Sequence, residues 1–285
     1  MQRRQWLKTA GATALSFAGF ESAWANTDTQ APKLLVVLLR GGMDGLAAVP
    51  PVGDVTYAAI RPTIAVQNSL PLDGSFALHP AFKHLHQLWG QGQLAVVHST
   101  GFSYSGRSHF EGQDLMQSGM AKPYTSASGW LGRAMQVARV GGGVSISIPM
   151  PLILRGNPDA STQFPNWMPP LSTPVANALE ALWAKDALIS PYASIIRAEA
   201  ATQRQAGMAR QDFGNARSLP ELGRLAGQEM GQAQGPRVGL IDFTHGFDTH
   251  ASQGGDQGGH ADQLVQLDRL VQNFQTAIGP QWSNT

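Results

Sequence analysis

The sequence predicts an α/β fold, in which helices flank a layered sheet of mostly parallel strands. The first indication is the continuous apolar run 33–39, which ends at Gly41 and Gly42 and is typical of a strand buried on both faces. The second is that such runs alternate with helical segments, as parallel strands joined by crossover helices require. The third is an apolar stripe at helical spacing near the end of the chain, formed by Leu264, Leu267, Val271, Phe274 and Ile278.

Four strands are expected along the chain, at 33–39, 93–97, 143–148 and 237–243. The third alternates apolar and polar residues, and we interpret 152–154 as its continuation after a proline break. No strand pattern follows the last helix, so we expect the sheet to be incomplete on its C-terminal side.

Helices are expected between these strands, at 80–89, 108–118, 130–139, 173–186 and 191–229. The first of them would carry Pro80 in its first turn, where a missing N–H costs nothing. The stretch from 200 to 235 is rich in Gln, Ala, Arg and Gly and poor in large apolar residues. We therefore interpret the region of about 190–235 as a helical excursion that faces solvent.

Composition limits the possible functions. The chain has 285 residues, 42% of them hydrophobic, which is enough for one large domain with a sizeable core. Its net charge of +1 argues against a nucleic-acid partner, because such domains usually carry a strong basic excess. It contains no cysteine, which excludes disulfide scaffolds, thiolate metal sites and cysteine nucleophiles.

The first 25 residues are typical of an export signal. Arg3 and Arg4 precede a short apolar stretch, and Ala23-Trp24-Ala25 supplies the small-x-small pattern that a signal peptidase reads. The paired arginines predict the twin-arginine route, with its export machinery as a partner and a periplasmic or secreted destination. An ordinary Sec signal with a chance arginine pair is the alternative; Trp6-Leu7-Lys8 favours the first interpretation.

The remainder of the chain is expected to hold a short polar linker, 26–32, and a single domain, 33–285. The apolar stretch of the signal is too short for a transmembrane helix, which needs about 20 apolar residues. We expect no transmembrane segment in the mature chain.

Three groups of residues follow predicted strands, where open α/β sheets bind their ligands. The first is Arg40-Gly41-Gly42-Met43-Asp44, in which Asp44 is the first carboxylate beyond the sheet edge. A carboxylate there could bind a divalent cation. The alternative is a turn aspartate that bonds its own backbone.

The second group surrounds Ser108, which lies three residues before Glu111 at the spacing of a capping box. A hydroxyl at a helix N-terminus faces free N–H groups that stabilise an anion, and Arg107 could add a phosphate or sulfate contact. His109 lies beside it. The alternative is that Ser108 only caps the helix and Arg107 is a surface charge.

The third group follows the last strand and includes Asp248 and His250, an Asp-x-His pair that can place oxygen and nitrogen on one cation. All eight histidines fall within 79–109 or 245–260. Both windows flank strand ends, so the clustering favours a metal site.

Several of these motifs occur together and in order: the twin-arginine leader, Arg40-Gly41-Gly42-x-Asp44-Gly45, Leu78-His79-Pro80, Arg107-Ser108-His109-Phe110-Glu111, Gly129-Trp130-Leu131-Gly132-Arg133 and Phe247-Asp248-Thr249-His250. In this order they resemble the bacterial exported family called domain of unknown function 1501, which is grouped with the alkaline phosphatase and sulfatase superfamily. The resemblance spans essentially the whole mature chain. It implies an alkaline phosphatase-like α/β domain with a two-metal site.

Carried over by motif, the resemblance makes Asp44, Asp248 and His250 expected ligands of divalent cations. It places Ser108 in the nucleophile region, with His109 and Arg107 beside it. The implied activity is metal-dependent hydrolysis of a phosphate or sulfate ester, whose ester group would be the ligand.

The sequence departs from the family pattern after Thr285, where relatives continue into further motifs that bring late metal ligands. The chain therefore looks truncated, and we expect no significant hydrolase activity from it alone. The alternatives are a non-catalytic periplasmic binding or assembly protein on the same fold, or an inactive fragment of the enzyme.

Overall fold

The computed structural model describes residues 31–146, 150–163, 218–243 and 246–285, with a few positions between 174 and 182. Residues 165–217 form a separate compact unit, and every element described below belongs to the other one. The predicted signal segment, 1–25, lies outside the described residues. So do the helix predicted at 173–186, apart from those few positions, and the stretch 191–217.

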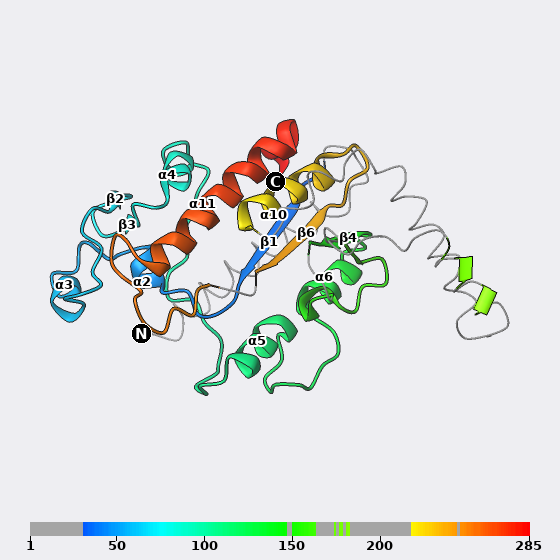
Figure 1. Ribbon diagram of the computed structural model, residues 1–285, viewed down its shortest axis with the longest axis horizontal. Coiled ribbons are helices and arrows are strands. Elements are labelled where there is room, and N and C mark those ends of the chain that lie inside the picture. The colour runs from blue at the N-terminus through cyan, green and yellow to red at the C-terminus, as the bar shows by residue number, and fades with distance from the viewer. Residues whose placement is uncertain are drawn as a thin grey trace, which may run out of the picture. The chain divides into compact units, whose positions relative to one another are not determined.

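The central element is a four-stranded sheet in the order β1-β6-β4-β5 (Figure 1). Its strands are β1 (Leu34–Leu39), β6 (Val238–Phe243), β4 (Gly143–Ser145) and β5 (Ser161–Thr162), and every pair is parallel. The predicted fold class, a mostly parallel sheet flanked by helices, is confirmed. A separate antiparallel pair, β2 (Leu70–Pro71) and β3 (Ala77–Leu78), lies outside this sheet.

Helices cover both faces of the sheet (Figure 1). On one side, α6 (Trp130–Val137) and the 3-10 turn η1 (Leu152–Leu154) pack on alternate strand residues. This buried cluster contains Leu38, Leu131, Met135, Val140, Ile153, Leu154, Val238 and Leu240. On the other side, α10 (Leu219–Gly231) and α11 (Gly259–Ile278) lie over β1 and β6.

The remaining helices are shorter. They are α2 (Gly45–Ala48), α3 (Tyr57–Ile60), α4 (Lys83–Gly90), α5 (His109–Ser118) and the 3-10 segment η3 (Gly279–Asn284). Within the described ranges, no helix is both long enough and apolar enough to cross a bilayer.

The solvent-facing interpretation of 190–235 is wrong for its last part. Helix α10 packs along α11 through glycines at every fourth position. A Cβ atom on Gly223 would lie 2.3 Å from the Leu270 carbonyl oxygen, and one on Gly227 would lie 2.7 Å from the Ala277 Cβ. The glycines of α10 therefore reflect close helix packing, because small residues let two backbones approach.

Two predicted strands are also wrong. Residues 93–97 form no ladder, and Val97 is 75% exposed. Leu94 and Val96 are half-buried between exposed neighbours, and Leu94 packs on a core cluster, but the segment pairs with no strand among the described residues. Residues 152–154 form the turn η1 instead of a strand.

The other boundaries differ less. Helix α4 begins three residues later than predicted, at Lys83. The predicted stripe on α11 is largely confirmed: Leu264, Phe274 and Ile278 are buried, and Leu267 and Val271 are half-buried.

Candidate functional site

Strands β1 and β6 end at the same sheet edge, because they are parallel and in register from Leu34 and Val238 onward. Arg40 and Asp242 meet there in a two-point ion pair, with Arg40 Nε 2.6 Å from Asp242 Oδ1 and Nη2 2.5 Å from Oδ2. Arg40 also donates from Nη1 to Gln113 Oε1 at 2.7 Å, which ties helix α5 to the strand ends. Sequence reasoning missed this pairing, since the two residues are 202 positions apart.

The turn after β1 brings two distant loops into contact. Gly41 and Gly42 have positive φ values of 100° and 76°, which L side chains rarely adopt. A Cβ atom on Gly41 would lie 2.8 Å from the backbone nitrogen of Asp248. One on Gly42 would lie 4.0 Å from His109 Cε1. The two glycines therefore let the loop after β6 and the start of α5 approach the end of β1.

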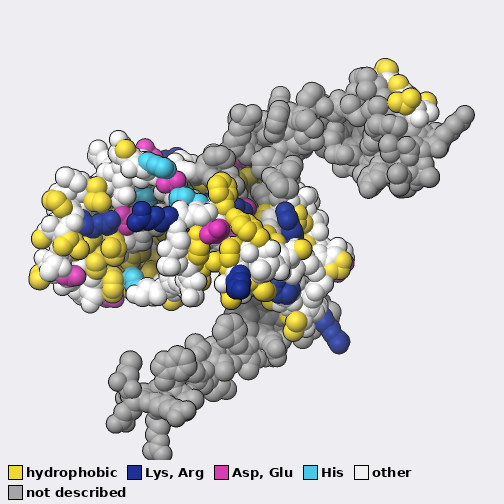
Figure 2. All heavy atoms as spheres, turned by 90° about the horizontal axis from the view of Figure 1, so that it is seen from below, with side chains coloured by type: hydrophobic (Ala, Val, Ile, Leu, Met, Phe, Trp, Pro, Cys, Tyr) yellow, Lys and Arg dark blue, Asp and Glu magenta, His cyan; other side chains and the backbone are white. Residues whose placement is uncertain are grey.

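Two imidazoles converge on Asp248 in this contact. Asp248 Oδ2 lies 2.9 Å from His250 Nε2 and 3.5 Å from His109 Nε2. The three side chains are 42%, 80% and 54% exposed, respectively, so solvent reaches the cluster. Figure 2 shows histidine and acidic side chains next to each other on one face of the molecule. We call these three residues the Asp248 cluster.

Asp44 has a different set of partners. It caps α2, since Oδ1 accepts from the backbone N–H groups of Leu46 and Ala47 at 3.1 and 3.2 Å. Arg61 forms an ion pair with both carboxylate oxygens. Gln253 donates from Nε2 to Oδ2 at 2.6 Å. All five hydrogen bonds go to one half-buried carboxylate.

The electrostatics of Asp44 follow from these contacts. Burial acts to raise its pKa, but the hydrogen bonds from Arg61 and Gln253 and the Arg61 charge outweigh that effect and lower the pKa overall. The same pair raises the pKa of Arg61. Asp44 is therefore held ionised and already neutralised by a cation of the protein.

Ser108 is the N-cap of α5, as the capping-box spacing predicts. Its Oγ accepts from the Glu111 backbone N–H at 3.3 Å. The Glu111 side chain does not return to Ser108; Tyr104 OH stands between them, 2.7 Å from Glu111 Oε2 and 3.1 Å from the Ser108 nitrogen. The cap is thus a three-residue arrangement, and Ser108 sits beside His109 of the Asp248 cluster.

Arg107 is exposed and makes no hydrogen bond or ion pair to the part of the chain that the structure describes. It lies one residue before the cap, so its guanidinium is available to a ligand at the N-terminus of α5. The structure confirms that Ser108 caps α5, and a cap does not exclude a second role for the hydroxyl.

His79 and His260 are buried and serve the fold. His79 Nδ1 accepts from the Ala81 N–H at 3.0 Å, so Nε2 carries the proton and donates to the Gly255 carbonyl at 3.0 Å. His260 is 1% exposed, and both of its ring nitrogens lack hydrogen-bond partners in the described residues. Burial lowers its pKa, against the opposing charge of Asp44.

The cluster fits a cation in donor type. One carboxylate and two imidazoles are ligands that Zn²⁺ and related divalent ions accept. Ligand atoms about 3.3 Å apart are expected around a tetrahedral zinc, from its usual bond lengths of about 2.0 to 2.1 Å. The 3.5 Å between His109 Nε2 and Asp248 Oδ2 is close to that value. Asp44 fits less well, because Arg61 already occupies its oxygens.

No preformed cage of three or more histidine and acidic ligands is present among the described residues. His250 and Asp248 are hydrogen-bonded to each other, so their side chains would turn slightly to share an ion. His245, in the same loop, lies outside the described residues.

In comparisons with known proteins, no protein-family model, no curated protein and no solved structure matches the chain.

Proposed function

We propose that the carboxyl edge of the sheet is a divalent-cation site built on the Asp248 cluster, and that this site acts on phosphate or sulfate esters. The observation that carries the proposal is the convergence of His109 and His250 on one oxygen of Asp248. A bound cation supplies a Lewis acid that polarises an ester oxygen and lowers the pKa of a hydroxyl.

The chain's own residues support an anionic substrate. Helix α5 points its N-terminus toward the cluster, because its first residue, His109, contacts Asp248. Free N–H groups and the helix dipole favour an anion at that place. Arg107 is exposed one residue before the cap and has the fork of donors that binds phosphate or sulfate in two points.

Ser108 is the nucleophile that the motif resemblance implies. Its hydroxyl stands at the same helix end, and in the present structure it accepts a single weak hydrogen bond, from the Glu111 N–H. A cap of that kind leaves the hydroxyl proton available to a base. The proposal keeps Asp44 as a helix cap and gives it no ligand role.

The test is a titration of the full chain with Zn²⁺ and with Mn²⁺ by calorimetry. Asp248→Asn and His250→Gln should each weaken binding about tenfold or more, since each removes a ligand. Asp262→Asn is the matched control, because Asp262 is an exposed carboxylate in the first turn of α11 and should leave affinity unchanged. Absence of stoichiometric binding, or equal affinity in all three variants, would contradict the cation site.

Turnover separates the enzyme from the alternative function. Para-nitrophenyl phosphate and sulfate are generic substrates for the two ester classes. Cation-dependent release of nitrophenol that is lost in Ser108→Ala supports the hydrolase. Cation binding without turnover of either ester is the result expected of this chain alone, and it fits both alternatives, the inactive fragment and the non-catalytic periplasmic binding or assembly protein.

Export by the twin-arginine route is a part of the proposal that rests on residues 1–25 alone. A fusion of these residues to a reporter that matures only when folded before transport should reach the periplasm. Replacing Arg3 and Arg4 by Lys should retain it in the cytoplasm.

A further inference from the structure

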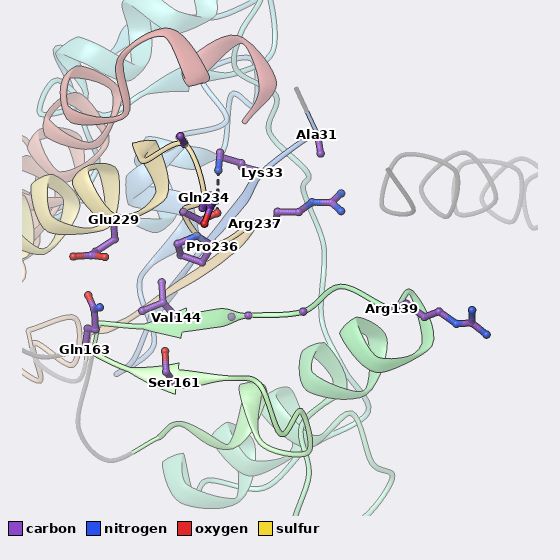
Figure 3. Close-up of a pocket in the computed structure, with 15 residues that line it drawn as sticks. Ala31, Lys33, Arg139, Val144, Ser161, Gln163, Glu229, Gln234, Pro236 and Arg237 are labelled. Carbon is purple, nitrogen blue, oxygen red and sulfur yellow. Dashed lines mark hydrogen bonds between the residues drawn. The ribbon is translucent and has the colours of Figure 1, made fainter. Parts of the chain in front are cut away.

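A cavity of about 640 Å³ lies at the end of the sheet where its strands begin, opposite to the end that carries the Asp248 cluster (Figure 3). All four parallel strands begin at this edge, so the residues just before or within their starts line it. Lys33 precedes β1, Arg237 precedes β6, Gly143 starts β4 and Ser161 starts β5. The turn between α10 and β6 closes one side. The cavity therefore lies at the far end of the strands from the Asp248 cluster.

Basic side chains dominate its charge. Among the described residues that line the cavity, Lys33, Arg139 and Arg237 are basic and Glu229 is acidic. In Figure 3, Lys33 and Arg237 come from neighbouring strand starts, whereas Arg139 stands at the rim and points away. Like charges held near one another in a partly buried place attract an anion that offsets their repulsion.

The Glu229 carboxylate does not face Lys33. Figure 3 shows Glu229 on α10 directed toward Gln163, away from Lys33. With its amide nitrogen turned to the carboxylate, Gln163 reaches within 3.0 Å of Glu229 Oε1. Amide donors thus serve Glu229, and the Lys33 ammonium has the Gly235 carbonyl at 3.4 Å as its hydrogen-bond partner.

The titration behaviour of the basic groups agrees with this geometry. Burial, and next the charge of Arg237, lowers the pKa of Lys33. Burial also lowers the pKa of Arg237. For Lys33, the shift shows that burial and the nearby Arg237 charge disfavour the charged ammonium in this cavity.

Backbone groups of three consecutive glycines also face the cavity. Gly141, Gly142 and Gly143 follow one another along one wall, and Gly142 has a φ of +66°. A Cβ atom on Gly142 would meet nothing within 4 Å, so the space beside it is open. Neither Gly141 nor Gly142 donates its N–H to a group in the described ranges. Glycine-rich turns with free N–H groups are a common cradle for phosphate oxygens.

We propose that this cavity binds a phosphate-bearing small molecule, with Lys33 and Arg237 holding the phosphate and the Gly141–Gly143 wall beside it. The volume exceeds what a bare phosphate needs and lies within the usual 300–1,000 Å³ of small-molecule sites. Lysine contributes a point charge, and arginine a two-point fork, to the same dianion. The site is separate from the proposed cation site and does not depend on it.

The test is calorimetric titration of the full chain with inorganic phosphate and with adenosine monophosphate, at constant ionic strength set by chloride. Both should bind, and Lys33→Gln and Arg237→Gln should each weaken binding about tenfold or more, as loss of a charged hydrogen bond does. Lys122→Gln removes the same charge at an exposed loop position far along the chain and should leave binding unchanged.

A second pair of variants guards against loss of folding. Gly141 has an ordinary φ, and a Cβ atom there would meet only Asp159 Oδ2, at 3.9 Å. Gly141→Asp should abolish phosphate binding by repulsion, whereas Gly141→Ser, of similar size, should retain it. Asp248→Asn should also retain it, which separates this site from the cation site.

Two results would overturn the proposal. One is that neither phosphate nor the mononucleotide binds to the folded wild-type chain. The other is that binding occurs but is equally strong in Lys33→Gln, Arg237→Gln and Gly141→Asp. Binding of the mononucleotide much more tightly than of phosphate would support an organic phosphate as the ligand, and equal binding would support inorganic phosphate.

Discussion

Asp44 and Asp248 follow neighbouring parallel strands, and the sequence predicts the same role for both, that of a metal ligand. Their surroundings in the structure differ. Asp44 receives five hydrogen bonds, two of them from Arg61, and its side chain is 19% exposed. Asp248 is 42% exposed and contacts two imidazoles. A guanidinium neutralises the first carboxylate at every physiological pH, whereas the second carboxylate contacts two imidazoles, which are themselves ligands of metal ions.

The difference shows how partner choice decides the role of a carboxylate. Arginine stays protonated at every physiological pH, so a carboxylate paired with it is a structural element. Histidine is neutral near pH 7 for much of its population and is itself a metal ligand. The Asp248 carboxylate can therefore still bind a cation together with its imidazoles, whereas the Asp44 carboxylate stabilises the fold through its ion pair with Arg61.

The largest effect is expected when Arg61 is removed. Arg61→Ala leaves Asp44 partly buried without its cation, which should reduce the free energy of unfolding by about 2 kcal/mol. Asp248→Asn, at the exposed cluster, should change it by less than about 0.5 kcal/mol. Urea denaturation of both variants measures the contrast, and equal losses would remove the distinction between the two carboxylates.

The pH dependence of the same pair sharpens this prediction. The pKa of Asp44 is lower in the folded chain than its ordinary value of about 3.9, so the folded state binds fewer protons than the unfolded one. The stabilisation is therefore complete above that value and is lost as the pH falls through the folded pKa. Arg61→Ala should flatten this acid limb of the stability curve.

A smaller effect is expected at the turn that joins the two loops. Gly41→Ala places a side chain at a φ of +100° and against the Asp248 backbone, which should cost about 1 to 2 kcal/mol of stability. It should also weaken Zn²⁺ binding, because Asp248 must move. Gly45→Ala is the control, since a Cβ atom there meets nothing within 4 Å. Unchanged zinc affinity in Gly41→Ala would show that the turn does not position the cluster.

The helix cap beside the cluster should contribute about 1 kcal/mol. Ser108→Ala removes the acceptor of the Glu111 N–H and should lower the thermal midpoint accordingly, whereas Ser108→Asn should restore it. Zn²⁺ affinity should stay the same in both variants. If stability and zinc affinity fall together, Ser108 supports the cluster directly and not only through α5.

The smallest effect is expected from His260. Burial lowers its pKa, so below about pH 6.5 the unfolded chain takes up a proton that the folded chain does not. Stability should therefore be full above that pH and decline as the pH falls below it. His260→Leu should reduce this slope in denaturation curves recorded between pH 5 and 7; an unchanged slope would assign it to other groups.

Sequence-based predictions of structure were correct where the pattern lay within a single helix or strand. The apolar run before Gly41, the stripe from Leu264 to Ile278 and the cap at Ser108 each reside in a single segment, and each is confirmed. Patterns that depended on neighbours failed. Residues 93–97 have strand composition but no ladder, and the glycines of α10 resembled a solvent-facing stretch because their partner, α11, is far along the chain.

The amino-acid sequence alone determined that this chain forms a parallel α/β sheet and that acidic and imidazole groups follow its strands, since periodicity and turn residues are local properties. Tertiary structure decided which of those groups meet. The Arg40–Asp242 pair forms because β1 and β6 align, and Gln253 reaches Asp44 from a segment 209 positions away. Arg61 is only 17 positions from Asp44, but nothing in the local pattern marks it as the partner.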